Sequence, residues 1–152
     1  MKLKHVAVLA VASVSAPVAF AQAKPEDQIK YRQSAMTVAA RSSAALAAIA
    51  KGDVPFNKDV AQRHAAVIAN LSDLPLLAGA YGPGTEKAAP TRADPKIWSE
   101  PEKFKAAFDK FTVAAKALPA AAADVGSLRT ALSGLGNSCK SCHDDYRLRD
   151  YR

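Results

Sequence analysis

Hydrophobic side chains recur every three to four residues in four segments of this chain, which is the period of an amphipathic helix. The segments span about residues 26–51, 58–71, 99–119 and 127–148. The predicted inward stripe of the first segment consists of Ile29, Gln33, Met36, Ala40, Ser43 and Ala47. That of the second consists of Val60, Val67, Ile68 and Leu71. That of the third consists of Phe104, Phe108, Phe111, Ala115 and Leu118. That of the fourth consists of Leu128, Leu132, Leu135, Cys139, Cys142, His143 and Tyr146.

Local signals indicate where these helices begin and end. Asn57 is a candidate N-cap of the second helix, and Ser99 with Glu102 three residues later forms a capping-box pattern for the third. Pro119 should kink or end the third helix. The only long connection, about residues 73–98, is rich in glycine and proline. We therefore predict an all-α fold, an antiparallel four-helix bundle with one long loop between helices two and three.

The N-terminus has the pattern of a secretory signal peptide. Two lysines precede an apolar run at residues 6–18 and an Ala-Phe-Ala cleavage pattern at 19–21. The run is too short and too rich in alanine for a good membrane span. We therefore predict a signal peptide at residues 1–21, cleaved after Ala21, and a mature single domain at residues 22–152 that resides in the periplasm.

The charge of the mature chain is modestly basic. Removing Lys2 and Lys4 from the 21 basic residues leaves 19 against 14 acidic residues, a formal charge of +5. This excess serves solubility and favours docking to acidic redox partners. No run of basic residues interleaves with aromatic ones, so we do not expect nucleic-acid binding. No second hydrophobic stretch approaches the length of a membrane span.

The run Cys-Lys-Ser-Cys-His at residues 139–143 has the attachment pattern of a c-type haem. Both thiols would bond to porphyrin vinyl groups, and the histidine would bind the iron. Residues three and four apart share a helix face, so Cys139, Cys142 and His143 can all point toward one flat ligand. The sequence therefore predicts one covalently attached haem c, with His143 as the proximal iron ligand.

Three other interpretations of this motif compete with haem attachment. A zinc site usually has four nitrogen or sulfur ligands, and the only other histidine of the mature chain is His64, which we expect at the boundary of an apolar face. A thiol oxidoreductase motif would follow a strand, and no strand pattern is present. A structural disulfide would leave His143 without a role.

The whole mature chain resembles class II cytochromes c of the cytochrome c prime type, which carry this motif near the C-terminus. The likeness is strongest at residues 24–33, 82–86, 97–98 and 139–147. The resemblance implies a homodimer packed through the first two helices, and a buried haem face with redox or gas-binding roles. Periplasmic redox proteins, NO and CO are the expected partners.

Position by position, the resemblance implies roles for residues outside the motif. Arg32 and Gln33 match residues that contact a haem propionate, and Thr85 and Glu86 match a loop near the haem edge. Arg147, one helical turn beyond the histidine, matches a residue beside the proximal imidazole, where it could tune the basicity of that ligand.

Met36 matches the position that faces the open side of the iron, and two states follow from it. If the thioether binds as sixth ligand, the haem is low-spin and the protein is a dedicated electron carrier. If it only packs over the iron, the haem is high-spin, five-coordinate and open to NO and CO. The Gly-Pro-Gly-Thr-Glu loop favours the second state. The stripe offers no distal acid–base pair, so we do not expect an enzyme.

Overall fold

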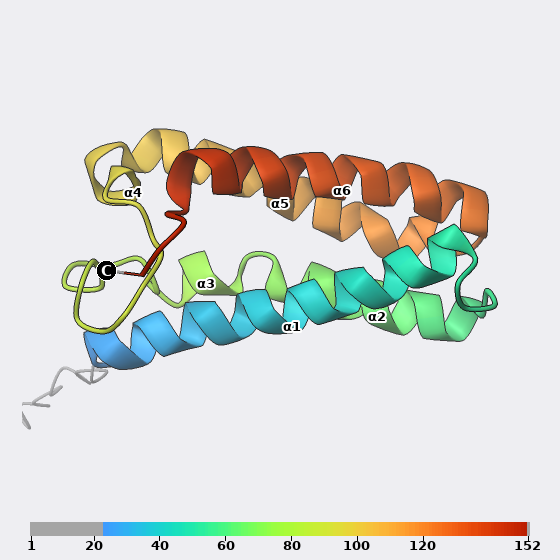
Figure 1. The fold of residues 1–152 in the computed structure, drawn as a ribbon, viewed down its shortest axis with the longest axis horizontal. Helices are drawn as coiled ribbons and strands as arrows, with labels where there is room; N and C mark the ends of the chain where they lie inside the picture. The colour runs from blue at the N-terminus through green and yellow to red at the C-terminus, as the bar shows by residue number, and fades with distance from the viewer. Residues whose placement is uncertain (1–22, 152) are drawn as a thin grey trace, which may run out of the picture.

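The structure, a computed structural model, describes residues 23–151 and is built from helices. Four long helices and two one-turn helices follow one another along the chain: α1 (Pro25–Lys51), α2 (Lys58–Leu71), α3 (Leu74–Leu77), α4 (Lys96–Ser99), α5 (Pro101–Ala121) and α6 (Val125–Tyr146). The four long helices run antiparallel to their neighbours in chain order (Figure 1). This arrangement confirms the predicted all-α four-helix bundle. The predicted signal peptide lies outside the described residues.

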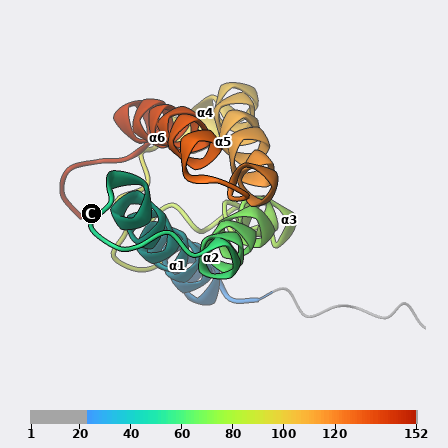
Figure 2. The same ribbon diagram turned by 90° about the vertical axis from the view of Figure 1, so that its right-hand side faces the viewer.

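The four long helices form a ring in which α1 contacts α2, α2 contacts α5, α5 contacts α6, and α6 returns to α1 (Figure 2). The α1–α6 side is the least closely packed of the four. The long connection after α2 crosses one end of the bundle and contains α3 and α4 at its two ends. Within residues 23–151 no helix is both long and apolar enough to cross a membrane.

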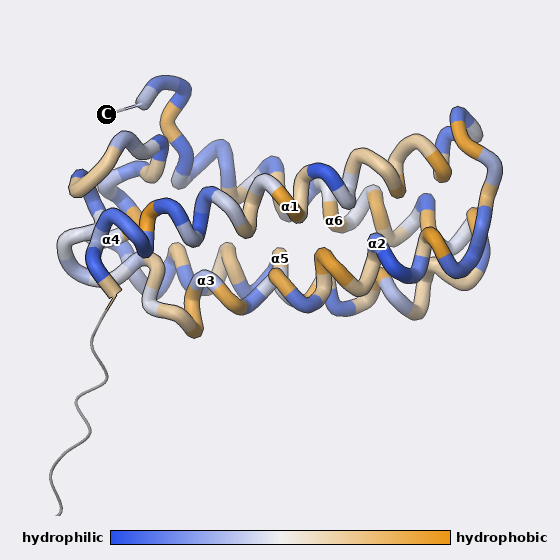
Figure 3. The backbone as a smooth tube through the Cα atoms, turned by 90° about the horizontal axis from the view of Figure 1, so that it is seen from below, coloured by the Kyte–Doolittle hydropathy of each residue, from blue (hydrophilic) through white to orange (hydrophobic). Residues whose placement is uncertain are grey.

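Hydrophobic and hydrophilic residues are interspersed along the four long helices (Figure 3). The predicted stripe of the third segment is confirmed in full, because all five of its residues are buried on α5. Its rings pack edge to face: Phe104 and Phe108 have centroids 5.8 Å apart, and Phe108 and Phe111 5.7 Å. Tyr81 from the long loop joins them, 4.8 Å from Phe104. These contacts fasten the loop to the core.

The predicted inward stripe of α1 is rotated by one residue from the observed one. The buried residues of α1 are Ile29, Arg32, Ala35, Ala39, Ser42, Leu46, Ile49 and Ala50. Of the predicted stripe only Ile29 is among them, whereas Gln33, Met36, Ala40 and Ser43 line cavities between α1 and α6. A shift of one position turns a helix by about 100°. Because α1 is rich in alanine, its own sequence does not fix which side faces the core.

The observed helix ends correct several predictions. Asn57 does cap α2, its side chain accepting a hydrogen bond from the Val60 N–H at 3.0 Å. The capping box at Ser99 is wrong: Ser99 ends α4, and α5 begins at Pro101, which suits the first helical position because it has no N–H to leave unpaired. α5 continues two residues past Pro119 to Ala121.

The last helix is also displaced from its predicted bounds. α6 begins at Val125, because the Asp124 carboxylate accepts a hydrogen bond from the Ser127 N–H at 2.9 Å. It ends at Tyr146 instead of Leu148, since the residues beyond pair with the long loop. The Leu148 N–H donates to the Arg92 carbonyl at 2.7 Å, and the Asp94 N–H donates to the Tyr146 carbonyl at 3.0 Å.

The Asp124 cap predicts a pH dependence of stability. The hydrogen bond from Ser127 holds the pKa of the Asp124 carboxyl below its ordinary value of 3.8. A carboxyl whose pKa is lower when folded stabilises the protein above the unfolded pKa, and that contribution is lost as the pH falls through the folded pKa. In urea unfolding from pH 6 to 2, the advantage of the wild type over Asp124→Asn, which keeps a neutral cap, is expected to shrink below about pH 4. A difference that is constant over this range would contradict the assignment.

Candidate functional site

Two adjoining cavities, of about 330 and 350 Å³, lie where α1, α5 and α6 meet. Both are lined by Met36, Ala40, Phe108, Cys142 and His143, and we refer to them together as the site cavity. It lies on the least closely packed side of the bundle, between the two helices that carry most of the predicted site residues.

The C-x-x-C-H motif lies in the last three turns of α6, and the helix brings its three functional side chains to one side. Cys142 and His143 line both cavities and Cys139 lines the second. Both cysteines are free thiols, half-buried against the core. Met36 reaches the same space from α1. The structure therefore brings Met36, Cys139, Cys142 and His143 together at one site cavity.

The electrostatics of the motif differ from those of a thiol oxidoreductase. Burial, with smaller effects of Cys139 and Asp145, raises the pKa of Cys142 to about 11, and burial also raises the pKa of Cys139. Redox-active thiols have a lowered pKa instead. The described residues also contain no strand, and no cluster of three or more His, Cys, Asp and Glu that could hold a metal ion. Neither the zinc nor the oxidoreductase interpretation finds support here.

The surroundings of His143 favour the neutral form of its imidazole, the form that binds metals. Burial lowers its pKa, and the nearby positive charges of Arg147 and Arg92 lower it further. A neutral imidazole has a free nitrogen lone pair for an iron ligand bond. His64, by contrast, lies on α2 with its Nδ1 3.5 Å from the Ser42 hydroxyl, and it is not among the residues that line the site cavity.

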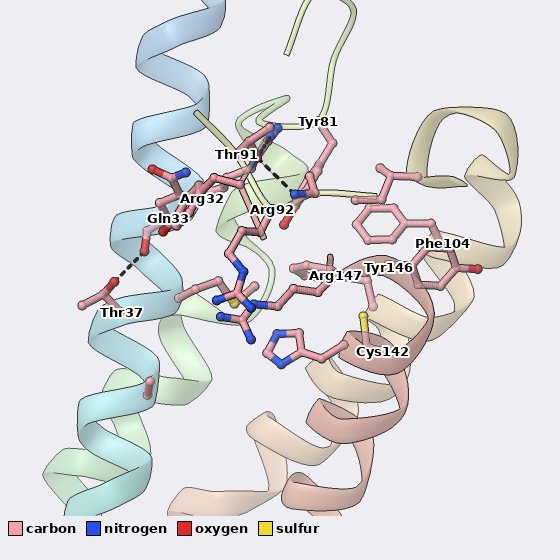
Figure 4. A pocket seen from close by; sticks show the side chains of 17 residues that line it. Arg32, Gln33, Thr37, Tyr81, Thr91, Arg92, Phe104, Cys142, Tyr146 and Arg147 are labelled. Atoms are coloured by element: carbon pink, nitrogen blue, oxygen red, sulfur yellow. Dashed lines mark hydrogen bonds between the residues drawn. The ribbon is translucent and has the colours of Figure 1, made fainter. Parts of the chain in front are cut away.

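The site cavity has one apolar end and one cationic end. The apolar end lies around Cys139 and is lined by Ala39, Ser43, Phe111 and Leu135. The opposite end is closed by the long loop and includes Arg32, Arg92 and Arg147 (Figure 4). Among the described residues, no Asp or Glu lines either cavity. Three guanidinium groups without a carboxylate among them favour an anionic occupant at this end.

Arg32 is buried, with 3% of its surface exposed, and fastens the long loop to α1. Its guanidinium donates hydrogen bonds to the carbonyls of Ala80 at 2.7 Å and Thr85 at 2.9 Å, and to the Thr91 hydroxyl at 3.0 Å. It also stacks over the Tyr81 ring, 4.9 Å from the centroid. Burial lowers the pKa of this guanidinium. The structure thus gives Arg32 a structural role that the sequence did not predict.

Of the other four residues predicted from the resemblance, two line the site cavity and two do not. Gln33 lines the cationic end and donates to the Pro90 carbonyl at 2.9 Å, and Arg147 lies just beyond α6 in the same cavity. Thr85 and Glu86 are not brought to the site cavity. Thr85 is instead buried in the loop, where its hydroxyl donates to the Gly82 carbonyl.

Several lining residues were not singled out from the sequence as site residues. They are Tyr81, Thr91, Arg92 and Tyr151. Burial raises the pKa of Tyr81 to about 12, so its phenol is neutral at physiological pH. All four lie outside the long helices, where no periodicity indicates which way a side chain points. Their recognition needed the tertiary structure.

The chemistry of these residues fits haem c. A haem has a broad apolar macrocycle, vinyl groups toward one edge and anionic propionates toward the opposite one. The apolar end of the site cavity carries Cys139, with Cys142 and His143 beside it, and the cationic end lies across from it. Covalent attachment at the thiols would direct the propionates toward the arginines.

A four-helix bundle whose last helix presents two cysteines and a histidine to one internal cavity defines a haem-binding bundle of the cytochrome type. The chain belongs to the Cytochrome C' family: the family model matches residues 27–147, from the first turn of α1 to the residue after α6. Membership of this family implies a haem c cofactor. The resemblance inferred from the sequence is thereby confirmed.

Individual relatives agree with this assignment. The chain is 44% identical over 126 residues to cytochrome c' of Rubrivivax gelatinosus, covering 82% of this chain and 96% of that protein. The crystal structure of cytochrome c' from Rubrivivax gelatinosus matches with a TM-score of 0.77, covering 82% of this chain and 97% of that chain at 44% identity. Cytochrome c' of Alcaligenes xylosoxydans xylosoxydans is 41% identical over 129 residues, covering 84% of this chain and 98% of that protein.

Some of the similar solved structures contain diatomic gases, and two of them hold different gases. One is a nitric oxide complex of a mutant of cytochrome c prime from Alcaligenes xylosoxidans, with a TM-score of 0.76. The other is a carbon monoxide-bound variant of cytochrome c prime from the same organism, with a TM-score of 0.75. Each is 40% identical to this chain and covers 84% of it and 98% of the solved chain.

Proposed function

We propose that this chain carries one haem c, bonded covalently through Cys139 and Cys142, and serves in one-electron transfer and in the binding of NO or CO at a five-coordinate iron. The single observation that carries this proposal is the convergence of both thiols and the His143 imidazole on one cavity, across which Met36 reaches from α1. When bound, the haem supplies an Fe(III)/Fe(II) couple and an open coordination position.

The residues of the chain have separate tasks in this function. Cys139 and Cys142 fix the cofactor to α6, and the lowered pKa of His143 favours the neutral imidazole that can bind the iron. Phe108 and Phe111 form part of the apolar wall of the cavity. The apolar surroundings of such a site set its access to solvent and its local dielectric, and through them the reduction potential of the haem.

The side of the cavity formed by α1 suits small apolar ligands. Its lining residues from this helix beyond Gln33 are Met36, Thr37, Ala39, Ala40 and Ser43. The half-buried Met36 side chain is flexible and can move aside for a diatomic ligand. The gas complexes of the Alcaligenes xylosoxidans protein support this open state, and they disfavour the alternative in which Met36 is a permanent sixth ligand. We propose binding without turnover, since the Arg32 donors already serve the loop.

We further propose that the protein is exported to the periplasm and forms a homodimer through α1 and α2. The N-terminal pattern of residues 1–21 supports export. Tyr31 and Val38 are exposed on α1, at 39% and 46% of their surface, and such apolar side chains suit a helix–helix interface. Light scattering of the purified mature protein should give twice the mass of one chain, and a single-chain mass would refute the dimer.

Optical spectra of the purified protein in the ferric and ferrous states, with and without CO and NO, test the proposed function. We expect a high-spin spectrum that changes on adding either gas. A low-spin spectrum with a sulfur-to-iron band that disappears in Met36→Leu would instead establish Met36 as a ligand and a dedicated electron carrier. A purified holoprotein preparation without any haem absorption would overturn both readings.

A further inference from the structure

Arg92 lies at the cationic end of the site cavity, and no residue between 23 and 151 gives it an acidic partner. It is part of the long loop, one residue after Thr91, whose hydroxyl is bound by Arg32. Figure 4 shows Arg92 extending from the loop, and Arg147 from the end of α6, into the same space between α1 and α6. No ion pair of the described residues includes either of these two arginines.

Arg32 and Arg92 differ in which of their guanidinium nitrogens already donate hydrogen bonds. Arg32 uses both of its terminal nitrogens to hold the loop. Arg92 donates only from Nε, to the Leu148 carbonyl at 2.9 Å. Within the part of the chain that the structure describes, its two terminal nitrogens form no hydrogen bond. Arg92 therefore has the planar pair of donors that a carboxylate can accept in a bidentate contact.

The C-terminal residues hold Arg92 in this position. Ala93 and Arg147 form an isolated antiparallel bridge, and the Leu148 N–H donates to the Arg92 carbonyl at 2.7 Å. The Arg92 guanidinium carbon lies 5.8 Å from the centroid of the Tyr151 ring. The chain after α6 thus binds Arg92 through its backbone, its Nε and its guanidinium face, which reduces the freedom that binding an anion would otherwise remove.

We propose that Arg92 is a positioning residue that binds a carboxylate of the cofactor, a haem propionate, at the cationic end of the site cavity. The inference rests on the proposed haem function and deepens it. The propionate edge would face away from Cys139, toward the cationic end of the cavity. Among the described residues Arg92 and Arg147 both keep unbonded donors at that end, and Arg92 is the one whose guanidinium is held in place by the C-terminal segment. A guanidinium beside the propionate would offset negative charge near the iron. It would therefore stabilise the ferrous state relative to the ferric state.

The reduction potential of the holoprotein tests this proposal. We expect Arg92→Gln to lower the potential, since losing a positive charge beside the propionate favours Fe(III). The matched control is Arg149→Gln, which removes the same charge from an exposed residue of the C-terminal segment that does not line the cavity. Arg92→Lys should recover part of the shift because it restores the charge without the planar pair of donors. The propionate bands of the resonance Raman spectrum should change in Arg92→Gln alone.

Each outcome has a distinct meaning. A potential that falls further in Arg92→Gln than in Arg149→Gln, with altered propionate bands, supports the contact. Equal shifts in the two variants, or a lower melting temperature of Arg92→Gln with unchanged potential and bands, would assign Arg92 a purely structural role and overturn the proposal. If every variant shows a haem spectrum, the proposed haem function stands whether or not Arg92 binds the propionate. If the wild type shows no haem spectrum, both the proposed function and the role of Arg92 are refuted.

Discussion

Replacing both Cys139 and Cys142 by serine is expected to abolish covalent haem attachment completely. The two thiols are the only cysteines in the chain, and both line the site cavity, so no other side chain can form the thioether bonds. The intact mass of the variant, expressed with the haem-attachment machinery, should equal that of the polypeptide alone. Any haem that remains bound through His143 should be extracted by acidified organic solvent.

A matched control lies inside the motif itself. Lys140 and Ser141 separate the two cysteines and are exposed on the outer side of α6. The double variant Lys140→Ala, Ser141→Ala should therefore retain one porphyrin per chain after denaturation. Porphyrin that stayed on the cysteine-free variant through denaturation would contradict the attachment site, and loss from the control would show that the outer face of the motif also matters.

Replacing Arg32 by methionine is expected to destabilise the protein by about 3–5 kcal/mol, because three buried acceptors lose their charged donor at once. Against a usual total stability of about 5–15 kcal/mol, this is a large loss. The carbonyls of Ala80 and Thr85 and the Thr91 hydroxyl would be left without this partner. The loop that closes the cationic end of the site cavity would then be held to α1 more weakly, with the hydrogen bond from Gln33 to the Pro90 carbonyl remaining.

Urea unfolding of the holoprotein measures this effect. Arg41→Met on the exposed face of α1 removes the same charge and chain length without touching the loop, and it should change stability by less than about 0.5 kcal/mol. If Arg32→Met fails to accumulate, Arg32→Lys provides the comparison, since an ammonium group can replace one of the three contacts but not the planar fork. Equal unfolding midpoints for the Arg32 and Arg41 variants would refute the structural role.

The two changes act on opposite sides of the same cavity. The cysteines are on α6 and determine whether the cofactor is bonded to the chain, whereas Arg32 is on α1 and determines whether the loop covers the cavity. Loss of the cysteines should change the intact mass and the optical spectrum while the fold stays intact. Loss of Arg32 should lower the free energy of unfolding, and as a consequence it should increase the access of solvent and gas to the cavity.

Much of the fold and the core of the site could be predicted from the sequence. Phe104, Phe108 and Phe111 recur at helical spacing, and large apolar side chains have no favourable place except a buried face, so that stripe was predicted correctly in full. The C-x-x-C-H spacing likewise requires a common direction for its three side chains once the segment is helical, because residues three and four apart share a face. Neither inference needs a distant part of the chain.

Only the tertiary structure decided the orientation of α1, the path of the long loop and the partners of Arg32. Alanine buries well on either side of a helix, so the phase of α1 is set by the helices packed against it. The loop is held in place by hydrogen bonds between residues 48 to 59 positions apart in the sequence, and no local pattern predicts these bonds. The same is true of Arg92, which meets the C-terminal segment 56 residues away.

The sequence by itself determined the helices and the attachment motif, since both follow from short-range geometry. The cationic end of the cavity exists only after the chain has folded, because its arginines come from α1, the loop and the end of α6.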